Sequence, residues 1–532
     1  MISKEIPFLS MLILLFLSFT PTVAQIATSE DTSLVDTTVY QAEEVVVTAT
    51  RYEKKIIDIP YPVTFFDNVD FQYSRKVSVN DVLSSVPGVL LQSRYGNHDV
   101  RISIRGFGSQ SNSGIRGVRI LLDGIPESEP DGQTRIEAID FNSVGRIEIV
   151  KGNLSSLYTN APGGVVNFLN DIYFPRSFVV SFNDFGSFDL RRNGFKMGIR
   201  TKDYAYLLTY SYHNYKGYRE HSEDFWHIVN SVLDVPLTDQ SQLQLLGYYV
   251  NGLIRLPGSL TKEEFEKDPF QAPERETKLD YRRVSKKGRV GIRYHTYLDD
   301  RRNKELQLTL YGTIKQFDRP STSYKIITRY GLGGRFHFLL KSEFFGKRNE
   351  FSIGGDMLHQ TGPVEKYDNI AGSKGDILKS ITNSIVANRG FFIQNSLTLW
   401  EDRLDMLFTG RYEKISVKTE DRLQAVRSDE VNFEDFTPKI GLIYKFTPSI
   451  ALYGSYGQSF NVPAKNELDN PPSFDPNDPY IGKHLNHHLN PSRAQNSEIG
   501  LKMSLRRKNS TFFSRIRSEI TFFNYHIKDE IV

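Results

Sequence analysis

The sequence predicts a mainly β fold, in which a transmembrane antiparallel β-barrel follows a small α/β domain. Three observations lead to this expectation. From about residue 176 to residue 532, apolar and polar residues alternate in segments of roughly ten residues, as in strands with one face on lipid. Short connections between these segments alternate with long polar ones, which is typical of barrels in outer membranes. Beyond residue 24, no apolar stretch reaches the roughly 18 residues of a membrane-spanning helix.

Residues 1–24 have the composition of a secretory signal peptide. Lys4 gives a basic start, and the apolar run FLSMLILLFLSF follows it. Small residues ending at Ala24 then supply a cleavage site. An uncleaved anchor is the alternative, but the apolar run is shorter than the ~20 residues that a spanning helix needs. The sequence therefore predicts an exported protein, and its lack of cysteine indicates a fold that does not rely on disulfides.

Residues 25–51 form an N-terminal extension that ends in an isolated strand-like run. The stretch EEVVVTATR begins at Glu43 and contains three consecutive valines. Valine favours strands, but no partner strand is evident beside it. Two interpretations stay open: the run pairs within the following domain, or it adds to the sheet edge of another protein.

Residues 52–171 do not alternate and are expected to form the small α/β domain. Residues 79–92 predict a short helix, with Asn80 as its cap, and then a strand. Residues 100–126 predict two short strands around a loop rich in glycine and serine. A further strand is expected at residues 146–151.

Residues 176–532 are expected to form the barrel. In the segment from Leu306, residues Leu306, Leu308 and Leu310 share one face, and the alternate positions are mostly polar. The segment from Leu404 alternates in the same way. About fifteen strands can be counted in this region. Long polar loops are expected at residues 251–281, 361–387, 418–433 and 460–495.

Several classes of protein are disfavoured by composition and motifs. The formal net charge of +3 is too small to favour nucleic-acid binding. No Gly-x-Ser-x-Gly elbow and no His-Glu-x-x-His motif occurs, so we expect a non-enzyme without a cofactor. His484, His487 and His488 could bind a metal or haem by their spacing. Because no carboxylate stands beside them in the sequence, we expect a solvated loop there and predict no metal site.

Motifs along most of the chain resemble those of TonB-dependent outer-membrane receptors. They are EEVVVTATR, DVLSSVPGV, ISIRGFGS, VRILLDGIP and, later, LYGSYGQSFNVPAKNEL and NPSRAQNSEIGLK. The stretch SGIRGVRILLDGIPESEPDGQ resembles the ferric dicitrate and siderophore branch of that family. The resemblance implies an outer-membrane barrel of about 22 strands, embedded in lipid, whose lumen holds residues 52–171 as a plug.

The resemblance also gives the leading valine run a role. It implies that residues 43–49 are a TonB box, which TonB and its inner-membrane energising complex bind as an added strand. The box consists of Glu43, Glu44, Val45, Val46, Val47, Thr48 and Ala49.

The chain departs from the family pattern in three respects. Lys151, Gly152 and Asn153 stand where the family usually has Arg-Gly-Pro, and Thr159 stands where it usually has glycine. About fifteen strands are too few for a barrel of about 22. Val532 is not the aromatic residue on which members usually end. We therefore expect a receptor that is truncated at its C-terminus.

Plug loops at residues 94–99, 108–116 and 127–135 are expected to meet the ligand. Their polar side chains could donate hydrogen bonds to an anionic iron chelate. Pairing of the arginines with carboxylates of the barrel wall is the alternative for each position. The predicted ligand-binding residues are Arg94, Gln110, Arg116, Gln133 and Arg135.

The function implied by the resemblance is energy-coupled uptake of a ferric chelate of the siderophore or citrate type. The same machinery could carry haem, cobalamin or a carbohydrate. A passive porin-like barrel is a third hypothesis, which the plug motifs and the valine run disfavour.

Overall fold

The computed structural model describes residues 46–48, 50–109, 114–400, 403–469, 478–506 and 515–531. These residues belong to the second of two compact units, Val45–Val532. The predicted signal peptide, residues 1–24, and residues 25–45 of the extension lie outside the described residues. Within them, no helix is both long enough and apolar enough to cross a membrane.

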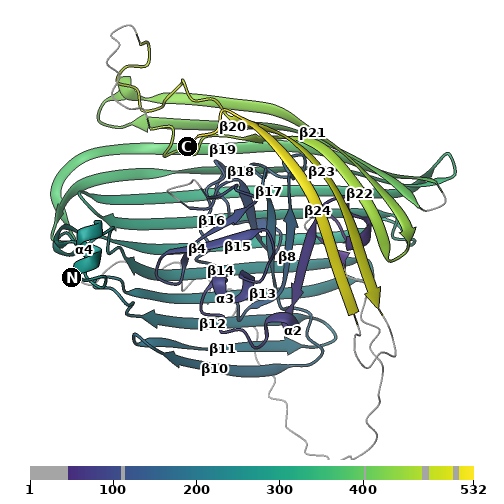
Figure 1. Cartoon of the computed structure of the whole chain (residues 1–532), viewed down its shortest axis with the longest axis horizontal. Helices are drawn as coiled ribbons and strands as arrows, with labels where there is room; N and C mark the ends of the chain where they lie inside the picture. Colours follow the sequence, from purple (N-terminus) through teal and green to yellow (C-terminus); the bar gives the residue numbers. More distant parts are fainter. Residues whose placement is uncertain are drawn as a thin grey trace, which may run out of the picture. The chain divides into compact units, whose positions relative to one another are not determined.

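One antiparallel sheet of 15 strands contains most of the described residues, as predicted, and its strands lie side by side in sequence order (Figure 1). Among the described strands, the first and the last do not pair with each other, so the sheet is open. The strands are β10 (Phe178–Gly186), β11 (Leu190–Arg200), β12 (Ala205–Tyr215), β13 (Asp224–Thr238), β14 (Ser241–Arg255), β15 (Arg282–Tyr297), β16 (Lys304–Pro320), β17 (Tyr324–Phe344), β18 (Lys347–Ile370), β19 (Ser373–Trp400), β20 (Leu404–Asp421), β21 (Asp429–Thr447), β22 (Ile450–Asn461), β23 (Ser492–Arg506) and β24 (Arg515–Lys528).

The predicted alternation fixes which face of each strand is buried. In β16, Leu308 and Leu310 are exposed on the outer face, whereas Tyr311 is buried. In β20, Phe408 is exposed and its neighbour Thr409 is fully buried. Because successive strand residues point to opposite faces, the apolar set of these two strands faces outward and their alternate set faces inward. In β13 and β14 the inner face also carries buried apolar side chains, such as Trp226 and Val250.

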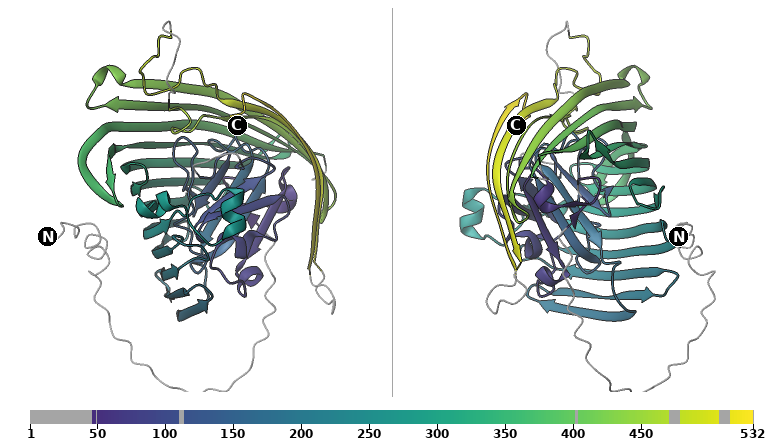
Figure 2. Two further views of the ribbon diagram at one scale, coloured as in Figure 1. Left: turned by 60° about the vertical axis from the view of Figure 1, so that its left-hand side comes forward. Right: turned by 90° about the vertical axis from the view of Figure 1, so that its right-hand side faces the viewer.

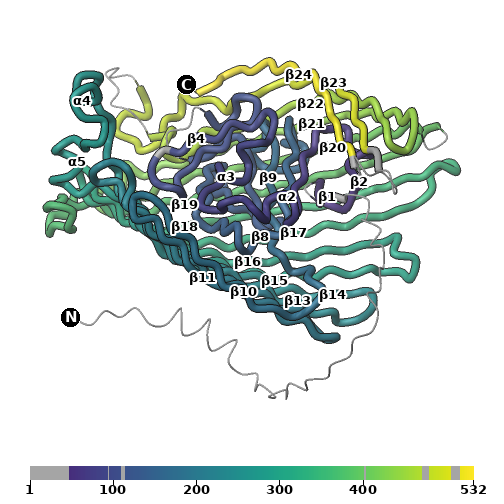
Figure 3. The backbone as a smooth tube through the Cα atoms, turned by 60° about the horizontal axis from the view of Figure 1, so that its bottom comes forward, coloured from purple at the N-terminus to yellow at the C-terminus, as the bar shows by residue number. Residues whose placement is uncertain are grey.

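The connections differ between the two ends of the sheet. At one end they are short turns, such as residues 239–240 between β13 and β14. At the other end, α4 (Lys262–Lys267) and α5 (Glu274–Lys278) lie in the long connection between β14 and β15, and residues 462–491 join β22 to β23. Figure 3 shows α4 and α5 at the opposite end from β1 (Val46–Val47) and β2 (Lys54–Lys55). We call these the short-turn end and the long-loop end.

Two of the predicted loops are wrong. Residues 361–387 are largely strand, because β18 and β19 continue to a tight turn at Ala371 and Gly372, which both have positive φ. Residues 418–433 are mostly the end of β20, the short helix η2 (Ala425–Arg427) and the start of β21. In both hairpins, paired backbone groups hold polar sequence in strand form beyond the apolar zone.

The α/β domain has a mixed sheet of five strands at its centre. The parallel pair β6–β9 lies within it, and the remaining pairs are antiparallel. The strand order is β3 (Val63–Asp67), β8 (Val144–Lys151), β9 (Gly164–Asn170), β6 (Val118–Leu122) and β7 (Ile125–Pro126); the domain also has the hairpin β4 (Val89–Tyr95)–β5 (Asp99–Ile104), the small sheet β1–β2, and the helices η1 (Ile56–Asp58), α2 (Asn68–Phe71) and α3 (Val79–Leu83).

The predicted cap of the helix expected within residues 79–92 is wrong by two residues. The helix α3 begins after Ser78, and Ser78 forms a capping box with Asp81. The Asp81 carboxylate accepts the backbone N–H of Ser78 at 3.0 Å. Asn80 instead donates its side-chain amide to the hydroxyl of Ser93, at 2.8 Å, and so connects the helix to β4.

The α/β domain packs against the inner face of the large sheet (Figure 2). Ile120 and Phe168 of the domain belong to the same buried apolar cluster as Trp226 of β13 and Val250 of β14. Fully burying one such aliphatic or aromatic side chain contributes about 1.5–3 kcal/mol. The inner face of the large sheet and the small domain therefore share one core.

Candidate functional site

The leading valine run is paired with the α/β domain in this structure. Strand β1 runs antiparallel to β2, with Val46 opposite Lys55 and Val47 opposite Lys54. Val47 is fully buried in an apolar cluster with residues of the domain and of the sheet. Of the predicted TonB box, Glu43, Glu44, Val45 and Ala49 lie outside the described residues, as does the side chain of Val46.

Thr48, directly after β1, is bonded to a buried carboxylate. Its backbone N–H and its hydroxyl each donate to the same oxygen of Glu148, both at 3.0 Å. Asn167 donates its side-chain amide to that oxygen at 3.3 Å. Glu148 is fully buried in β8, and this burial raises the pKa of its carboxyl despite the hydrogen bonds that it accepts.

Arg51 joins the leading segment to the wall of the large sheet. It has a positive φ of 83°, and its guanidinium lies 3.8 Å from the ring centre of Tyr158. Its Nη2 donates to Asp356 of β18 at 2.7 Å. Asp356 also accepts from Arg411 of β20, at 2.9 Å. Burial lowers the pKa of Arg51 to about 10, although Asp356 opposes that shift.

A second contact with the wall lies beside the first. Lys54 forms an ion pair with Glu350 of β18 at 3.2 Å and donates to the Ser396 hydroxyl at 3.0 Å. The Tyr52 hydroxyl donates to Glu350 at 3.1 Å, and burial raises the pKa of Tyr52 to about 12. Because Glu350 lies close to the turn between β17 and β18, the leading segment is held at the short-turn end.

A cavity of about 440 Å³ adjoins this fastened segment. Thr48 and Arg51 line one side of it, and Arg293 of β15 and Arg335 of β17 line the wall side. The segment therefore borders a space between the α/β domain and the wall.

Two predicted ligand residues lie together at the long-loop end, beneath residues 462–469. The Arg116 guanidinium donates to the Glu467 carboxylate and, at 2.7 Å, to the Val462 carbonyl. Gln133 donates its side-chain amide to Asp131 at 2.8 Å, and Asp131 accepts the backbone N–H of Lys465 at 2.9 Å. In this structure Arg116 is bonded to the barrel's own loop, which is the alternative left open for it.

Arg135 belongs to a different cluster. It lies 3.7 Å from Asp99 of β5, and the ring of Phe317 is 5.7 Å from its guanidinium. Burial and the charge of Arg283 lower the pKa of Arg135 to about 10. The neighbouring Glu137 is fully buried; burial alone would raise its pKa, but Lys287 and Arg283 bring it to about 2. Arg94 has no described side chain, and Gln110 lies outside the described residues.

A row of cations in the wall was missed by sequence reasoning. Arg319 of β16 is directly opposite Lys325 of β17, and Lys325 is directly opposite Lys366 of β18. Strand parity places all three on the inner face, since Lys315 and Arg335 at the same parity bond to Glu129 and to the Gly124 carbonyl of the α/β domain.

The register places Lys325 and Lys366, two like charges, directly opposite each other. Like charges directly opposite each other on one face of a sheet are destabilising. Among the described residues, no carboxylate lies within ion-pairing distance of Lys325 or Lys366, although the charge of Asp469 acts on Lys325 from further away. The signal available in the sequence was that Lys315, Arg319 and Lys325 share one parity across the turn at residues 321–323.

The three outer-loop histidines each contact a different carboxylate. His484 lies 2.8 Å from Asp421, His487 lies 2.8 Å from Asp429, and His488 lies 3.5 Å from Asp478. Within the described part of the chain, the only group of three or more His, Cys, Asp or Glu side chains that could share an ion is elsewhere, at His98, His213 and Asp224. His484 and His487 therefore connect the loop after β22 to the β20–β21 hairpin, whereas His488 contacts a carboxylate of its own loop.

Family models match both parts of the chain. The model described as "TonB dependent receptor-like, beta-barrel" matches residues 266–532, and the "TonB-dependent Receptor Plug Domain" matches residues 55–165. The chain is 31% identical to the vitamin B12 transporter BtuB of Vibrio vulnificus over 127 residues, and 30% identical to the hemin receptor of Yersinia enterocolitica over 128. Each match covers 24% of this chain, but only 20% and 18% of those proteins.

Solved structures share the fold. The unliganded ferric citrate transporter FecA superposes with a TM-score of 0.70 at 16% identity, over 89% of this chain and 75% of that one. The ferric yersiniabactin receptor FyuA of Yersinia pestis superposes with a TM-score of 0.67 at 13% identity, over 88% of this chain and 73% of that one. These features together show that the chain belongs to the TonB-dependent receptors, outer-membrane proteins that are not enzymes.

Proposed function

We propose that this protein is a receptor for the energy-coupled uptake of a ferric chelate, of the siderophore or citrate type, across the outer membrane. In this proposal residues 52–171 are the plug, residues 176–532 belong to the barrel, and TonB binds residues 43–49. The ligand enters at the long-loop end, and TonB acts at the short-turn end.

The row formed by Arg319, Lys325 and Lys366 is the observation that carries the choice of an anionic cargo. Lys366 is exposed and Lys325 is half-buried, so both can reach a ligand in the space above the plug. Three cations in register on neighbouring strands attract a polyanionic chelate before it meets the plug. We propose that Gln133 and Arg135 take part from the plug, together with Arg94, Gln110 and Arg116, once residues 462–469 move away.

The coupling step starts from the fastened leading segment. Strand β2 occupies one edge of β1, so an added strand of TonB either pairs with the other edge or displaces β2. Force on the box then acts on Thr48 and Arg51, which connect it to Glu148 of the plug and Asp356 of the wall. Loss of these contacts would open the neighbouring cavity of about 440 Å³ towards the short-turn end.

A second candidate cargo class has specific support. Two matched relatives are named a vitamin B12 transporter and a hemin receptor, and both matches are at least 30% identical. Cobalamin or haem uptake therefore stands as the alternative cargo for the same machinery.

A binding assay with candidate cargoes tests the proposal. The purified chain is titrated with ferric citrate, a ferric siderophore, haem and cobalamin, and binding is read from quenching of intrinsic fluorescence. The variants Lys325→Gln and Lys366→Gln remove charges from the row, and Lys414→Gln is the matched control, because Lys414 lies on the outer face of β20 beside Glu434.

We expect anionic ferric chelates to bind to the unmodified chain. Each row variant should bind them about tenfold more weakly, because loss of one charge contact costs about 1.4 kcal/mol of binding free energy. The control variant should bind normally. Binding of cobalamin alone, or equal affinities in all three variants, would contradict an anionic ferric cargo.

A further inference from the structure

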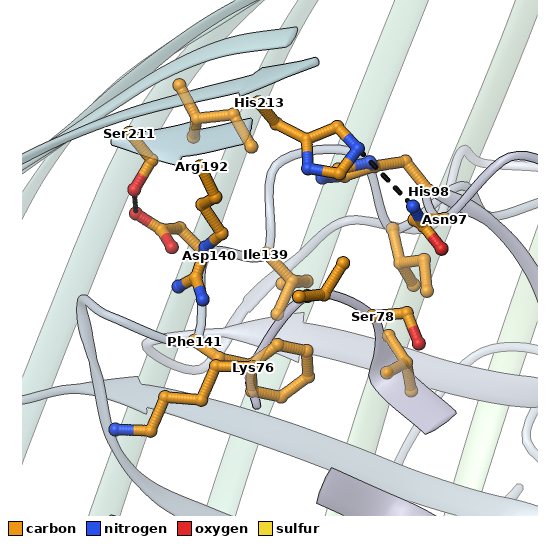
Figure 4. A pocket seen from close by; sticks show the side chains of 14 residues that line it. Lys76, Ser78, Asn97, His98, Ile139, Asp140, Phe141, Arg192, Ser211 and His213 are labelled. Carbon is orange, nitrogen blue, oxygen red and sulfur yellow. Dashed lines mark hydrogen bonds between the residues drawn. The ribbon is translucent and has the colours of Figure 1, made fainter. Parts of the chain in front are cut away.

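Two imidazoles and a carboxylate meet between the plug and the wall at the long-loop end. His98 lies in the plug turn between β4 and β5, His213 lies in β12, and Asp224 is the first residue of β13. Nδ1 of His98 is 3.4 Å from Oδ2 of Asp224, and Nε2 of His213 is 3.6 Å from the same oxygen. One ligand atom from each residue lies within 4.8 Å of the other two. Figure 4 shows the two imidazoles side by side with Asn97.

We propose that His98, His213 and Asp224 bind a divalent first-row transition ion, with Zn²⁺ as the reference case. Imidazole and carboxylate are ligands that such ions prefer. With bonds of about 2.0–2.1 Å, two ligand atoms of a tetrahedral site lie roughly 3.4 Å apart. The two separations from Oδ2 of Asp224, 3.4 and 3.6 Å, match that spacing.

The buried carboxylate of Asp224 needs a positively charged partner. Its side chain is fully inaccessible to solvent, and it accepts the backbone N–H of Asn97 at 2.5 Å and the indole N–H of Trp226. Within the described ranges, its ion-pair partners are the two histidines. Arg283, whose charge acts on Asp224 from further away, is itself paired with Asp99 and Glu137. Since a buried carboxylate is stable only when paired or bound to metal, the positive charge has to come from an imidazolium or from an ion.

The backbone is shaped to bring the plug turn close to this carboxylate. Gly96 has a φ of +59°, and a Cβ built there would lie 2.5 Å from Cγ and Oδ2 of Asp224. Glycine is therefore needed at this position for both its conformation and its size. The close approach places the imidazole of His98 between His213, with ring centres 4.8 Å apart, and Trp226, at 5.0 Å.

Room for further ligands lies beside the imidazoles. The side-chain amide of Asn97 is 3.4 Å from Nε2 of His213, and rotation of this amide would present its oxygen to the ion. His213 also lines a cavity of about 20 Å³ together with Asp140 and Arg192, which is enough for one water molecule (Figure 4). Nδ1 of His213 is buried and has no hydrogen-bond partner among the described residues, so a water there would accept its proton.

The ion would connect the two parts of the receptor. One ligand comes from the plug and two come from neighbouring strands of the wall, so the bound ion holds the β4–β5 turn against β12 and β13. This inference is independent of the cargo and of TonB binding, because it concerns only contacts of the plug at the long-loop end.

Metal titration of the full chain tests the inference. The purified protein is freed of metal with a chelator and titrated with Zn²⁺ by calorimetry near neutral pH; Co²⁺ is then added and its visible d–d absorption recorded. The variants His98→Ala and His213→Ala each remove one ligand. His484→Ala is the matched control, because His484 also contacts a carboxylate, Asp421, but shares it with no second imidazole.

We expect one tightly bound Zn²⁺ per chain and Co²⁺ absorption typical of a tetrahedral site. His98→Ala should weaken Zn²⁺ binding by about 100-fold or more, beyond the roughly 10–100-fold effect of losing a partner outside the ligand set. The control should bind as the unmodified chain does. Two results would overturn the inference. One is that the unmodified chain binds no Zn²⁺, as expected for an imidazolium–carboxylate pair; the other is that His98→Ala binds Zn²⁺ with the same affinity as the unmodified chain. If His213→Ala fails to fold, these two results still decide it.

Discussion

Thr48 donates both its backbone N–H and its hydroxyl to one carboxylate oxygen of Glu148, at 3.0 Å each. The two residues are 100 positions apart, and they join the leading segment to a buried strand of the plug. Asn167 of β9 donates to the same oxygen, so the contact involves two neighbouring strands of the plug sheet. Any partner that takes the leading strand has to work against this contact.

Removal of the Glu148 carboxylate should release the leading strand. In a Val47→Cys background, we expect Glu148→Ala to speed maleimide labelling of residue 47 by about tenfold or more, because it removes the acceptor of two hydrogen bonds from Thr48, each of which contributes about 0.5–1.5 kcal/mol. The chain has no native cysteine, so labelling reports this position alone. Val47→Cys with Glu148 intact is the control, and equal labelling rates in the two proteins would show that the contact does not hold the strand.

The same carboxylate should give stability a pH dependence. Burial raises the pKa of Glu148, so the folded protein holds this proton more tightly than the unfolded chain does. The stability that this group contributes is present below the ordinary carboxyl pKa of about 4.3 and is lost as pH rises through the raised pKa. Relative to Glu148→Gln, the denaturation midpoint of the unmodified chain should therefore fall over that interval. Parallel pH profiles for the two proteins would refute this assignment.

Asp356 should be essential for docking of the leading segment on the wall. It accepts from both Arg51 and Arg411. In Asp356→Asn, Arg411 keeps Glu413 as a partner at 3.4 Å, whereas Arg51 loses the one carboxylate that it contacts among the described residues. Breaking a buried pair in this way costs about 3–5 kcal/mol. The urea concentration that exposes a cysteine at position 47 should fall accordingly.

Asp435→Asn is the matched control for that experiment. Asp435 pairs with Arg493 at 2.6 Å, but the Arg493 side chain is 51% exposed. Exposed pairs contribute only about 0–1 kcal/mol. A shift in Asp435→Asn as large as that in Asp356→Asn would argue against a special role for the buried pair.

Local patterns in the sequence account for most of the fold. Leu308 and Leu310 could be placed on the outer face because the lipid requires apolar side chains at every second position of a strand. Residues 361–387 could not be recognised as strand, because the ends of β18 and β19 have the polar composition of a loop and are held by pairing with each other. Composition indicates whether a residue faces water or lipid, but it does not show which residues pair across a hairpin.

Fewer contacts of the candidate site could be predicted from local sequence patterns. Arg116 could be named as a polar residue of a plug loop, but its partner Glu467 is 351 positions away. The opposition of Lys325 and Lys366 depends on the register of two strands, which the sequence alone does not specify. His98 stood in a predicted ligand loop, whereas its neighbours His213 and Asp224 come from two separate strands.

Salt should weaken cargo binding if the cation row attracts an anion. Between about 0.05 and 0.5 M NaCl, the Debye length falls several-fold, so solvent-exposed charges at the long-loop end are increasingly screened. We expect the affinity for an anionic ferric chelate to fall over this range, and to fall less steeply in a Lys325→Gln/Lys366→Gln double variant. The affinities are measured by fluorescence quenching. If the affinity depends equally on salt in both proteins, Lys325 and Lys366 do not provide the electrostatic attraction.

Deletion of residues 43–49 tests the coupled-receptor account most directly. In cells that express the chain, binding of a radiolabelled ferric chelate at the surface and its accumulation inside are measured with and without the deletion. The account predicts that surface binding persists, because the ligand loops and the cation row are unchanged, while accumulation is lost because TonB has no strand to bind. Accumulation that continues at an undiminished rate without residues 43–49 would contradict it, and would indicate a passive route through the sheet.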